Sequence, residues 1–399
     1  MSIDAHDPDP TDSSGAGAEP GVVSDAAAPV PMSAEAATVL SVDAMGGDKG
    51  AQAVVDGVAR FLAETPDASV LLHGPEGDLA PMVARAGLGD RVTIVSATQT
   101  VAMTDKPSHI MRNGKDTSMW SAVDAVRDGR AGAVVSCGNT GALMAVAMLR
   151  LRRAAGVDRP AIACLWPSHN PSGFNVMLDV GADIRADAHD LMTFAMMGAS
   201  YARNGLGLAR PRVGLLNVGT EEHKGRAELK AAQDMMEVAA PLGEFEYVGF
   251  VEGGDLPSDR VDVIVTDGFT GNIALKTGEG TATLVGDLLR GALRSSPLAM
   301  IGGLLARGSL RRAGARVDPR HNNGGVFLGL NGCVVKSHGS ADATGVASAL
   351  RLAYQLSRNG FTRRVAARLA AVASLTAPGV AEDAAEVAAT PAADAGGRP

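Results

Sequence analysis

The sequence alternates short apolar runs with longer stretches of helical periodicity, and this alternation continues from residue 38 to residue 375. The apolar runs are rich in Val, Ile and Leu without strict alternation, as expected of strands that are buried on both faces. Strand–helix–strand repetition predicts a mostly parallel sheet with helices on both sides. We therefore expect an α/β fold, a three-layer α/β/α sandwich, formed by a single domain over 38–375.

Each apolar run and each helical stretch gives one predicted element, and neither an internal repeat nor a Pro/Ser linker interrupts the series. Strands are predicted at 38–43, 69–73, 91–95, 132–136, 161–165, 175–180, 212–218, 246–251, 261–266 and 332–336. Helices are predicted at 50–63, 78–86, 117–129, 140–153, 186–204, 224–240, 271–294, 298–313 and 340–358.

Composition excludes several classes of protein. Of the 399 residues 46% are hydrophobic, enough for a large core, and the formal net charge of −8 argues against a nucleic-acid partner. The cysteines, Cys137, Cys164 and Cys333, form no CxxC pair, and the eight histidines never fall at metal-ligand spacing. We expect no disulfide, no metal and a reducing cytoplasmic location.

The two ends of the chain differ from the middle. Residues 1–37 are rich in Asp, Pro, Ser, Gly and Ala and lack the cationic start and apolar stretch of a signal peptide. Residues 376–399 have a similar Ala/Glu/Asp/Pro/Gly composition. We expect both segments to be disordered tails. No stretch approaches the roughly 18 apolar residues that a membrane span requires.

Five glycine-containing loops follow predicted strands and suggest an anion site. They are DAMGGD (43–48), SCGNTGA (136–142), LDVGAD (178–183), NVGTEEHKG (217–225) and TDGFTGN (266–272). Ligands of parallel sheets bind at the carboxyl ends of strands, and glycine lets backbone N–H groups approach an anion closely. We expect the five loops to meet at one edge of the sheet, although each alone is typical of an ordinary turn.

Together these five stretches resemble the bacterial acyl-acyl-carrier-protein:phosphate acyltransferases, the PlsX family, over about 39–357. The resemblance implies a fold related to phosphotransacetylases and isocitrate-dehydrogenase-like proteins. It implies transfer of a fatty acyl group from acyl carrier protein to inorganic phosphate for phospholipid synthesis, with no cofactor. It also implies a homodimer associated peripherally with the inner face of the cell membrane, where a membrane glycerol-3-phosphate acyltransferase is a further partner.

Three positions depart from the family's usual pattern. Lys49 begins a Lys-Gly-Ala stretch where His-Ala-Pro is common, Asp183 replaces Asn, and Cys137 replaces a small residue. The motifs assign the following residues to substrate binding: Asp43, Gly46, Gly47, Asp48, Gly138, Asn139, Thr140, Gly141, Asp179, Gly219, Thr220, Glu221, Asp267, Gly268, Thr270 and Gly271. Structural roles remain open for the four aspartates, and Asn139 could simply begin a helix as its N-cap.

Acyl-phosphate formation from a thioester needs positioning and charge stabilisation more than acid–base catalysis, because phosphate is anionic and a thiol of pKa about 8.5 leaves readily as thiolate. Lys224 is the predicted cation and Asn272 the predicted neutral donor. The alternatives are a solvated lysine and a helix N-cap. An acyl-enzyme at Cys137 is less favoured, because no histidine motif accompanies it; His223 and His338 read as loop or cap residues.

Residues 281–316 predict a protruding helical hairpin. Its tip is apolar, arginines follow, and no acid occurs between Asp287 and Asp318. This pattern suits an anionic membrane surface or an acidic carrier protein, and a dimer-interface helix pair is the alternative. The predicted membrane contacts are Leu298, Met300, Ile301, Leu304, Leu305, Arg307, Arg311 and Arg312.

Two other functions remain open. A phosphotransacetylase acting on acyl-CoA would use the same fold, and a non-catalytic lipid-surface scaffold could retain it. The basic hairpin and the specific motifs favour the acyl-carrier-protein enzyme over the first. The presence of Lys224 and Asn272 favours it over the second.

Overall fold

The computed structural model describes residues 38–221, 223–317 and 324–375. All ten predicted strands are present, and an eleventh lies between the hairpin and the last predicted strand. The strands are β1 (Thr38–Asp43), β2 (Ala68–Gly74), β3 (Val92–Ser96), β4 (Ala133–Ser136), β5 (Ala161–Pro167), β6 (Phe174–Leu178), β7 (Arg212–Leu216), β8 (Glu246–Val251), β9 (Val263–Val265), β10 (Gly325–Leu328) and β11 (Cys333–Lys336).

All nine predicted helices are present, and two more occur in the described residues, α3 and α11. The helices are α1 (Gly50–Glu64), α2 (Glu76–Arg85), α3 (Pro107–Asn113), α4 (Ser118–Arg127), α5 (Thr140–Leu151), α6 (Ala188–Leu206), α7 (Ala227–Gly243), α8 (Gly268–Leu293), α9 (Pro297–Val317), α10 (Ala343–Arg358) and α11 (Phe361–Leu375). The two predicted tails lie outside the described residues, and the single-domain assignment remains a prediction.

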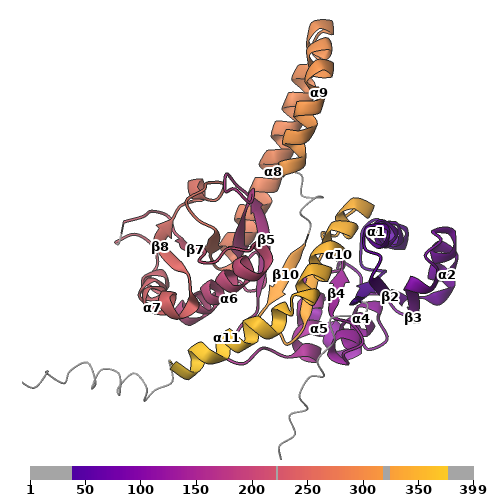
Figure 1. The fold of residues 1–399 in the computed structure, drawn as a ribbon, viewed down its shortest axis with the longest axis horizontal. Coiled ribbons are helices and arrows are strands. Elements are labelled where there is room, and N and C mark those ends of the chain that lie inside the picture. The colour runs from indigo at the N-terminus through magenta and orange to yellow at the C-terminus, as the bar shows by residue number, and fades with distance from the viewer. Residues whose placement is uncertain (1–37, 222, 318–323, 376–399) are drawn as a thin grey trace, which may run out of the picture. The chain divides into compact units, whose positions relative to one another are not determined.

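The strands form one eleven-stranded sheet in the order β3-β2-β1-β4-β11-β10-β5-β6-β9-β7-β8 (Figure 1). Most neighbours are parallel, but β10 is antiparallel to both β11 and β5, and β5 is antiparallel to β6. Three reversals separate the β1–β4–β11 set from the β6–β9–β7 set, so the two sets run in opposite directions. The expectation that all five glycine loops share one sheet edge is therefore wrong.

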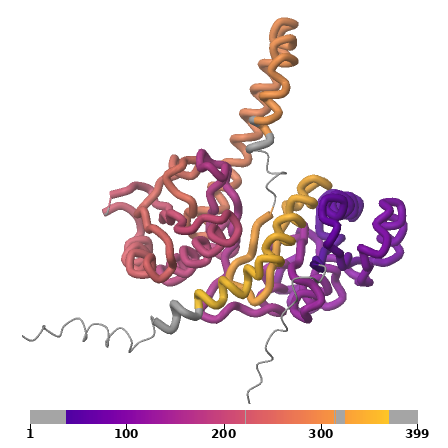
Figure 2. The backbone as a smooth tube through the Cα atoms, in the orientation of Figure 1, coloured from indigo at the N-terminus to yellow at the C-terminus, as the bar shows by residue number. Residues whose placement is uncertain are grey.

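Two hydrophobic cores lie on opposite faces of the sheet. Ala133 and Val135 of β4 belong to the core covered by α1, α6, α7, α10 and α11, whereas Val134 between them belongs to the core beneath α4 and α5. Successive strand residues point to opposite faces, so an apolar run without alternation fills both cores. Helices distant in sequence pack together on the first face, α10 on α1 and α11 on α6 (Figure 2). The predicted three-layer α/β/α sandwich is confirmed.

Helix α7 begins three residues later than predicted. Its first residue is Ala227 and its N-cap is Arg226, so Lys224 lies in the preceding loop and does not open the helix. Gly225 adopts φ +92°, a left-handed conformation that helical residues do not share, and it explains why the helix starts after it.

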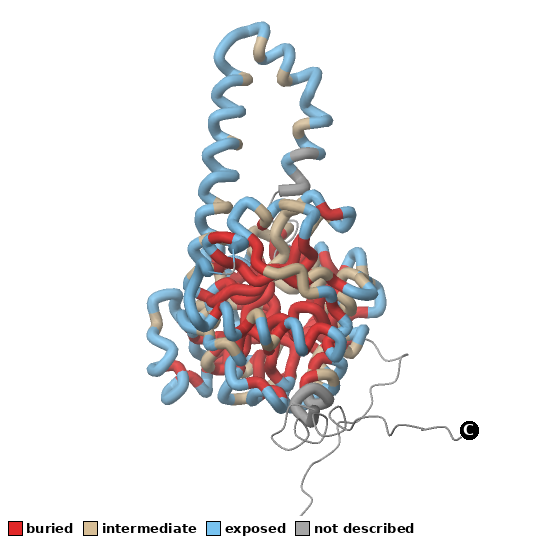
Figure 3. Tube along the Cα trace, turned by 90° about the vertical axis from the view of Figure 1, so that its left-hand side faces the viewer, coloured by how far each residue is buried: buried red, intermediate tan, exposed pale blue. Residues whose placement is uncertain are grey.

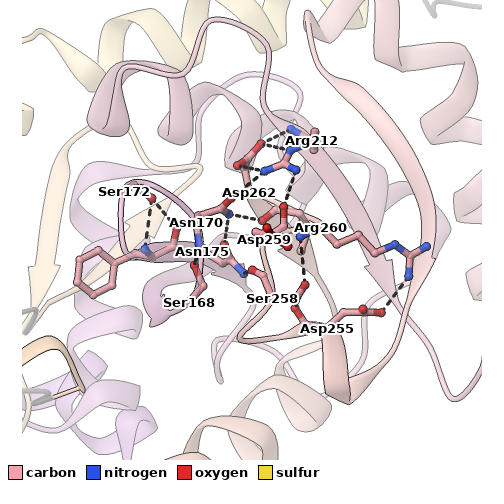
Figure 4. A network of polar contacts seen from close by, with 12 residues as sticks. Ser168, Asn170, Ser172, Asn175, Arg212, Asp255, Ser258, Asp259, Arg260 and Asp262 are labelled. Atoms are coloured by element: carbon pink, nitrogen blue, oxygen red, sulfur yellow. Dashed lines mark hydrogen bonds and ion pairs between the residues drawn. The ribbon is translucent and has the colours of Figure 1, made fainter. Parts of the chain in front are cut away.

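A polar network fixes the opposite ends of the strands in the second set (Figure 4). The Arg212 guanidinium, at the start of β7, donates to both carboxylate oxygens of Asp262 at 2.9 and 3.0 Å and to Oδ1 of Asn170 at 2.8 Å. Asn175 of β6 donates to the carbonyl oxygens of Leu256 and Ser258. Buried polar groups paired in this way are structural, and they hold β6, β7 and β9 in register.

Helices α8 and α9 pack against each other as an antiparallel pair and are exposed over most of their length (Figure 3). The predicted hairpin is therefore present, although its first helix begins at Gly268, just after β9. None of the helices in the described ranges combines the length and the apolar composition that crossing a bilayer requires.

Candidate active site

A row of polar side chains crosses the carboxyl ends of four neighbouring parallel strands. The register pairs Asp43 of β1 with His73 of β2 and with Ser136 of β4, and pairs Ser136 with Lys336 of β11. The row before it is wholly apolar, with Val42 beside Leu72 and Val135. Polar residues at equivalent strand ends, next to glycine loops, are typical of a ligand site in an α/β sheet.

Asp43 is buried, and its carboxylate is held by hydrogen bonds. The hydroxyls of Ser118 and Ser136 each donate to it at 2.7 Å, and the Met45 N–H donates at 3.2 Å. Burial raises the pKa of Asp43, while the two serines and Lys336 oppose the increase. The carboxylate thus organises the strand ends, which is the structural alternative left open for it.

Three loops, DAMGGD, SCGNTGA and KSHGS, pack against one another next to this row, because their glycines allow close backbone contact. A Cβ on Gly46 would lie 2.5 Å from the Gly138 nitrogen, and one on Gly47 would lie 3.4 Å from the Gly339 carbonyl oxygen. The Asp48 N–H donates to that same carbonyl at 2.8 Å. The DAMGGD and SCGNTGA loops therefore meet, and the third member is the KSHGS loop after β11.

Asn139 has a structural role in the same loop. Its Oδ1 accepts from the Ala142 N–H at 3.0 Å, and its amide donates to the carbonyl oxygens of Met103 and Asp105. The side chain caps α5, as the N-cap alternative predicted. The N–H groups of Thr140 and Gly141, in the first turn of α5, are the donors that this helix can offer to an anion.

The other three loops form a second cluster at the ends of β6, β9 and β7. Asp179 is buried and accepts from the N–H groups of Ile162, Gly181, Ala182 and Asp183. Burial raises its pKa in spite of these bonds. Asp179 thus fixes the conformation of its own loop, which is the structural role that the sequence analysis left open for the four aspartates.

Asp267 is the N-cap of α8 and accepts from the Thr270 N–H at 2.8 Å. It also forms an ion pair with Arg226, from the loop after β7. Burial would raise the pKa of Asp267, but these donors outweigh it and the pKa is lowered. Cβ atoms on Gly268 and Gly271 would overlap the carbonyl oxygens of Asp183 and Asp179, so the helix start presses directly on the LDVGAD loop.

Asn272 is not the N-cap of α8, so the alternative role given for it in the sequence analysis is wrong. It lies beyond the first turn of α8, beside Gly181, and its exposed carboxamide makes no hydrogen bond to any other residue of the described ranges. Lys224 is also exposed, and its Nζ forms an ion pair with Glu221 Oε1 at 2.7 Å. Glu221 raises the pKa of Lys224, which is therefore fully charged at neutral pH. Gly219 and Thr220 lie in the same loop.

One face of α8 joins the two clusters. Asn272, Lys276 and Glu279 are spaced four and three residues apart, so they share a face of the helix. Burial lowers the pKa of His338 in the KSHGS loop, and Lys276 lowers it further, so Lys276 lies within electrostatic range of the first cluster. Lys276 also forms an ion pair with Glu279 at 2.8 Å. The loops of the two clusters follow strands that run in opposite directions, and helix α8 connects the two clusters.

Comparisons with known proteins identify the family. A family model described as "Fatty acid synthesis protein" matches residues 38–364. A phosphate acyltransferase of Jannaschia sp. (strain CCS1) is 65% identical over 334 residues, 84% of this chain and 92% of its own. One from Dinoroseobacter shibae is 64% identical over 345 residues, 86% of this chain and 90% of its own. The chain belongs to the PlsX family of phosphate acyltransferases. It is an acyltransferase.

Solved structures support the fold assignment of this PlsX-family member. A phosphotransacetylase from Streptococcus pyogenes superimposes with a TM-score of 0.54 at 17% identity, covering 80% of this chain and 94% of its own. The EutD phosphotransacetylase from Staphylococcus aureus gives 0.51 at 14% identity, covering 83% and 96%. The predicted phosphotransacetylase-like α/β/α fold is confirmed.

Three polar residues of the candidate site were not predicted from the sequence: Ser118, Arg226 and Lys336. Lys336 ends the apolar run CVVK, just as Asp43 and Ser136 end VLSVD and AVVS. That shared position was the signal that could have found it. Over the described ranges, no group of three or more His, Cys, Asp or Glu side chains is arranged to hold a metal ion.

Proposed function

We propose that this protein transfers a fatty acyl group from acyl carrier protein to inorganic phosphate, producing an acyl phosphate for phosphatidic acid synthesis. The observation that carries the proposal is the family membership, supported by relatives about two-thirds identical that are named phosphate acyltransferase. The two polar clusters joined by α8 support the proposal, because they offer donors to an anion.

The proposed reaction is a single acyl exchange. A phosphate oxygen attacks the thioester carbonyl carbon, so that an O–C bond forms, the C–S bond breaks and the carrier's thiolate leaves. The carbonyl oxygen gains negative charge in the transition state, and a positioned donor there lowers the barrier. The thiolate afterwards takes a proton from water.

In this proposal Asn272 donates its amide to the thioester oxygen, and Lys224 attracts the anionic reactants. The exposed carboxamide of Asn272, without a hydrogen-bond partner in the described ranges, is available for that contact. Lys224 can exchange its Glu221 partner for a substrate anion, because the ion pair is solvent-exposed and such pairs are weak.

We also propose that the hairpin tip contacts an anionic membrane surface and that the protein is a homodimer. Leu298 and Leu305 are 79% and 84% exposed on α9, which is unusual for large apolar side chains. The remaining proposed membrane contacts are Met300, Ile301, Leu304, Arg307, Arg311 and Arg312. This arrangement would release a hydrophobic product next to lipid, where a membrane glycerol-3-phosphate acyltransferase would use it.

The proposal is tested with acyl carrier protein loaded with palmitate. Purified protein and inorganic phosphate should release free carrier thiol and form a hydroxylamine-reactive acyl phosphate in equal amounts. Release of carrier thiol in an assay from which inorganic phosphate is omitted would indicate simple hydrolysis of the thioester. Absence of release at every chain length would favour the non-catalytic scaffold.

A phosphotransacetylase acting on acyl-CoA is the second candidate, because the solved phosphotransacetylases share the fold. The same assay with palmitoyl-CoA in place of the loaded carrier distinguishes the two. A higher kcat/KM for palmitoyl-CoA would select the second candidate.

A further inference from the structure

Lys336 is a partly buried cation that lacks a carboxylate partner. Its Nζ donates to the carbonyl oxygens of Ser337 and, at 3.4 Å, Cys137, and no carboxylate in the described ranges lies within ion-pair distance of it. Burial lowers the pKa of Lys336 to about 8, so the group is still mostly protonated at neutral pH. A cation kept out of water without a counter-ion is disfavoured unless an anion reaches it.

The surroundings of Lys336 are suited to a small oxyanion. Its register partner Ser136 ends the strand that leads, through Gly138 and Asn139, to the first turn of α5. The N–H groups at that helix start favour negative charge. The Gly46–Gly47 turn closes against the same loop, so backbone groups line part of the position, next to the side chains of Met119 and Pro107.

We infer that Lys336 binds the inorganic phosphate that accepts the acyl group, together with the first turn of α5. This inference rests on the proposed function and adds a residue to it. The surroundings of the two lysines explain why Lys336 and not Lys224 is assigned to phosphate. Lys224 is exposed and forms an ion pair with Glu221, whereas Lys336 is partly buried and forms no ion pair with a carboxylate of the described ranges. The phosphate subsite therefore lies in the first cluster, and Asn272 lies in the second, with Lys276 between them.

Charged groups from several neighbouring segments act on Lys336. Carboxylates and the thiol raise its pKa, while Lys276 lowers it. A bound phosphate adds negative charge and raises the pKa toward its ordinary 10.5, so phosphate binding should take up a proton between about pH 8 and that value. The groups that face Lys336 are Asp43, Asp48, Cys137 and Lys276, and its own loop adds His338.

Titration calorimetry with inorganic phosphate measures this proton directly. Wild-type protein is titrated at about pH 8.5, near the Lys336 pKa, in two buffers of different ionisation enthalpy. We expect proton uptake on binding. Lys336→Met should weaken phosphate binding by about 10-fold or more, and Lys336→Arg should retain binding without proton uptake, because arginine stays charged. Circular dichroism melting confirms that each variant is folded.

Lys49→Met is the matched control, because it removes an exposed lysine of the adjacent loop with the same change in charge. It should bind phosphate as the wild type does. Equal binding by wild type and Lys336→Met, or equal weakening by Lys336→Met and Lys49→Met, would overturn the inference.

Failure of the inference and failure of the proposed function give different results. If wild-type protein binds phosphate through Lys336 yet never forms acyl phosphate, the subsite stands and the function is wrong. If acyl transfer occurs with an unchanged KM for phosphate in Lys336→Met, the function stands and the subsite is wrong.

Discussion

The Asn272 carboxamide and the Lys224 ammonium are exposed and contribute little to packing, so their removal separates activity from stability. Asn272→Ala should reduce kcat for acyl transfer by about 100- to 1,000-fold, the typical effect of one oxyanion donor. Lys224→Ala should abolish transfer. Melting temperatures of both variants should stay within a few degrees of the wild type. A fully active Lys224→Ala variant would refute its assignment.

His73 predicts a pH dependence of stability. It is buried, bonded to the hydroxyls of Ser41 and Ser121, and burial lowers its pKa to about 3. The unfolded chain protonates this histidine below about pH 6.5 while the folded chain does not. Stability should therefore fall as pH decreases from 6.5 toward 3, by up to a few kcal/mol. Urea titrations at several pH values should show a shallower loss for His73→Gln.

Helix α8 contains a matched pair of glycines with different surroundings. A Cβ on Gly271 would overlap the Asp179 carbonyl oxygen, whereas nothing lies within 4 Å of one on Gly280. Gly271→Ala should cost about 1–3 kcal/mol of unfolding free energy and impair activity, because the LDVGAD loop must move. Gly280→Ala should stabilise by up to about 1 kcal/mol. Equal melting temperatures would contradict the close packing of the helix start.

The tip of the hairpin gives a prediction for α9. Leu304 and Leu305 are exposed, so Leu304→Asp with Leu305→Asp should leave the fold and the activity in solution unchanged. Because charge opposes insertion of the tip into lipid, the double variant should sediment poorly with anionic liposomes. Unchanged sedimentation would remove the membrane proposal for this element.

For the whole molecule, the exposed apolar residues of α8 below the tip predict self-association. Leu284 and Leu288 are one helical turn apart, point away from the core and are 59% and 65% exposed. Replacing both with Asp should convert a dimer to a monomer in sedimentation velocity. The tip variant should remain dimeric, which separates the two surfaces. A wild-type monomer at micromolar concentration would refute the homodimer.

The positions of strands could be predicted from the sequence because a buried run such as 132–136 has a distinctive apolar composition. Their directions could not, because an apolar run looks the same in either direction. The short strand β10, only four residues long, creates two of the three antiparallel pairings and was missed. Those two reversals cancel each other. The incorrect expectation of a single loop edge came from the third, the antiparallel pairing of β5 with β6, which reverses the direction of β6, β9 and β7.

The candidate site was partly predictable for a related reason. Glycine loops mark strand ends, so Gly46, Gly138 and Gly271 could be found without coordinates. The end of the CVVK run could likewise have pointed to Lys336, but its partial burial could not be predicted, because it depends on strands brought together from distant parts of the chain. The exposure of Asn272 likewise depends on where α8 begins, four residues before it.

Helix α8 runs without interruption from Asn272 in the candidate site to Leu293 near the end of the hairpin. From Asn272 to Leu293 the helix rises about 32 Å at 1.5 Å per residue. The distance between a bilayer bound at the tip and the candidate site would thus be set by a continuous helix and not by a flexible linker. Lengthening that helix by one turn would move the candidate site away from the lipid by about 5 Å while leaving its residues unchanged.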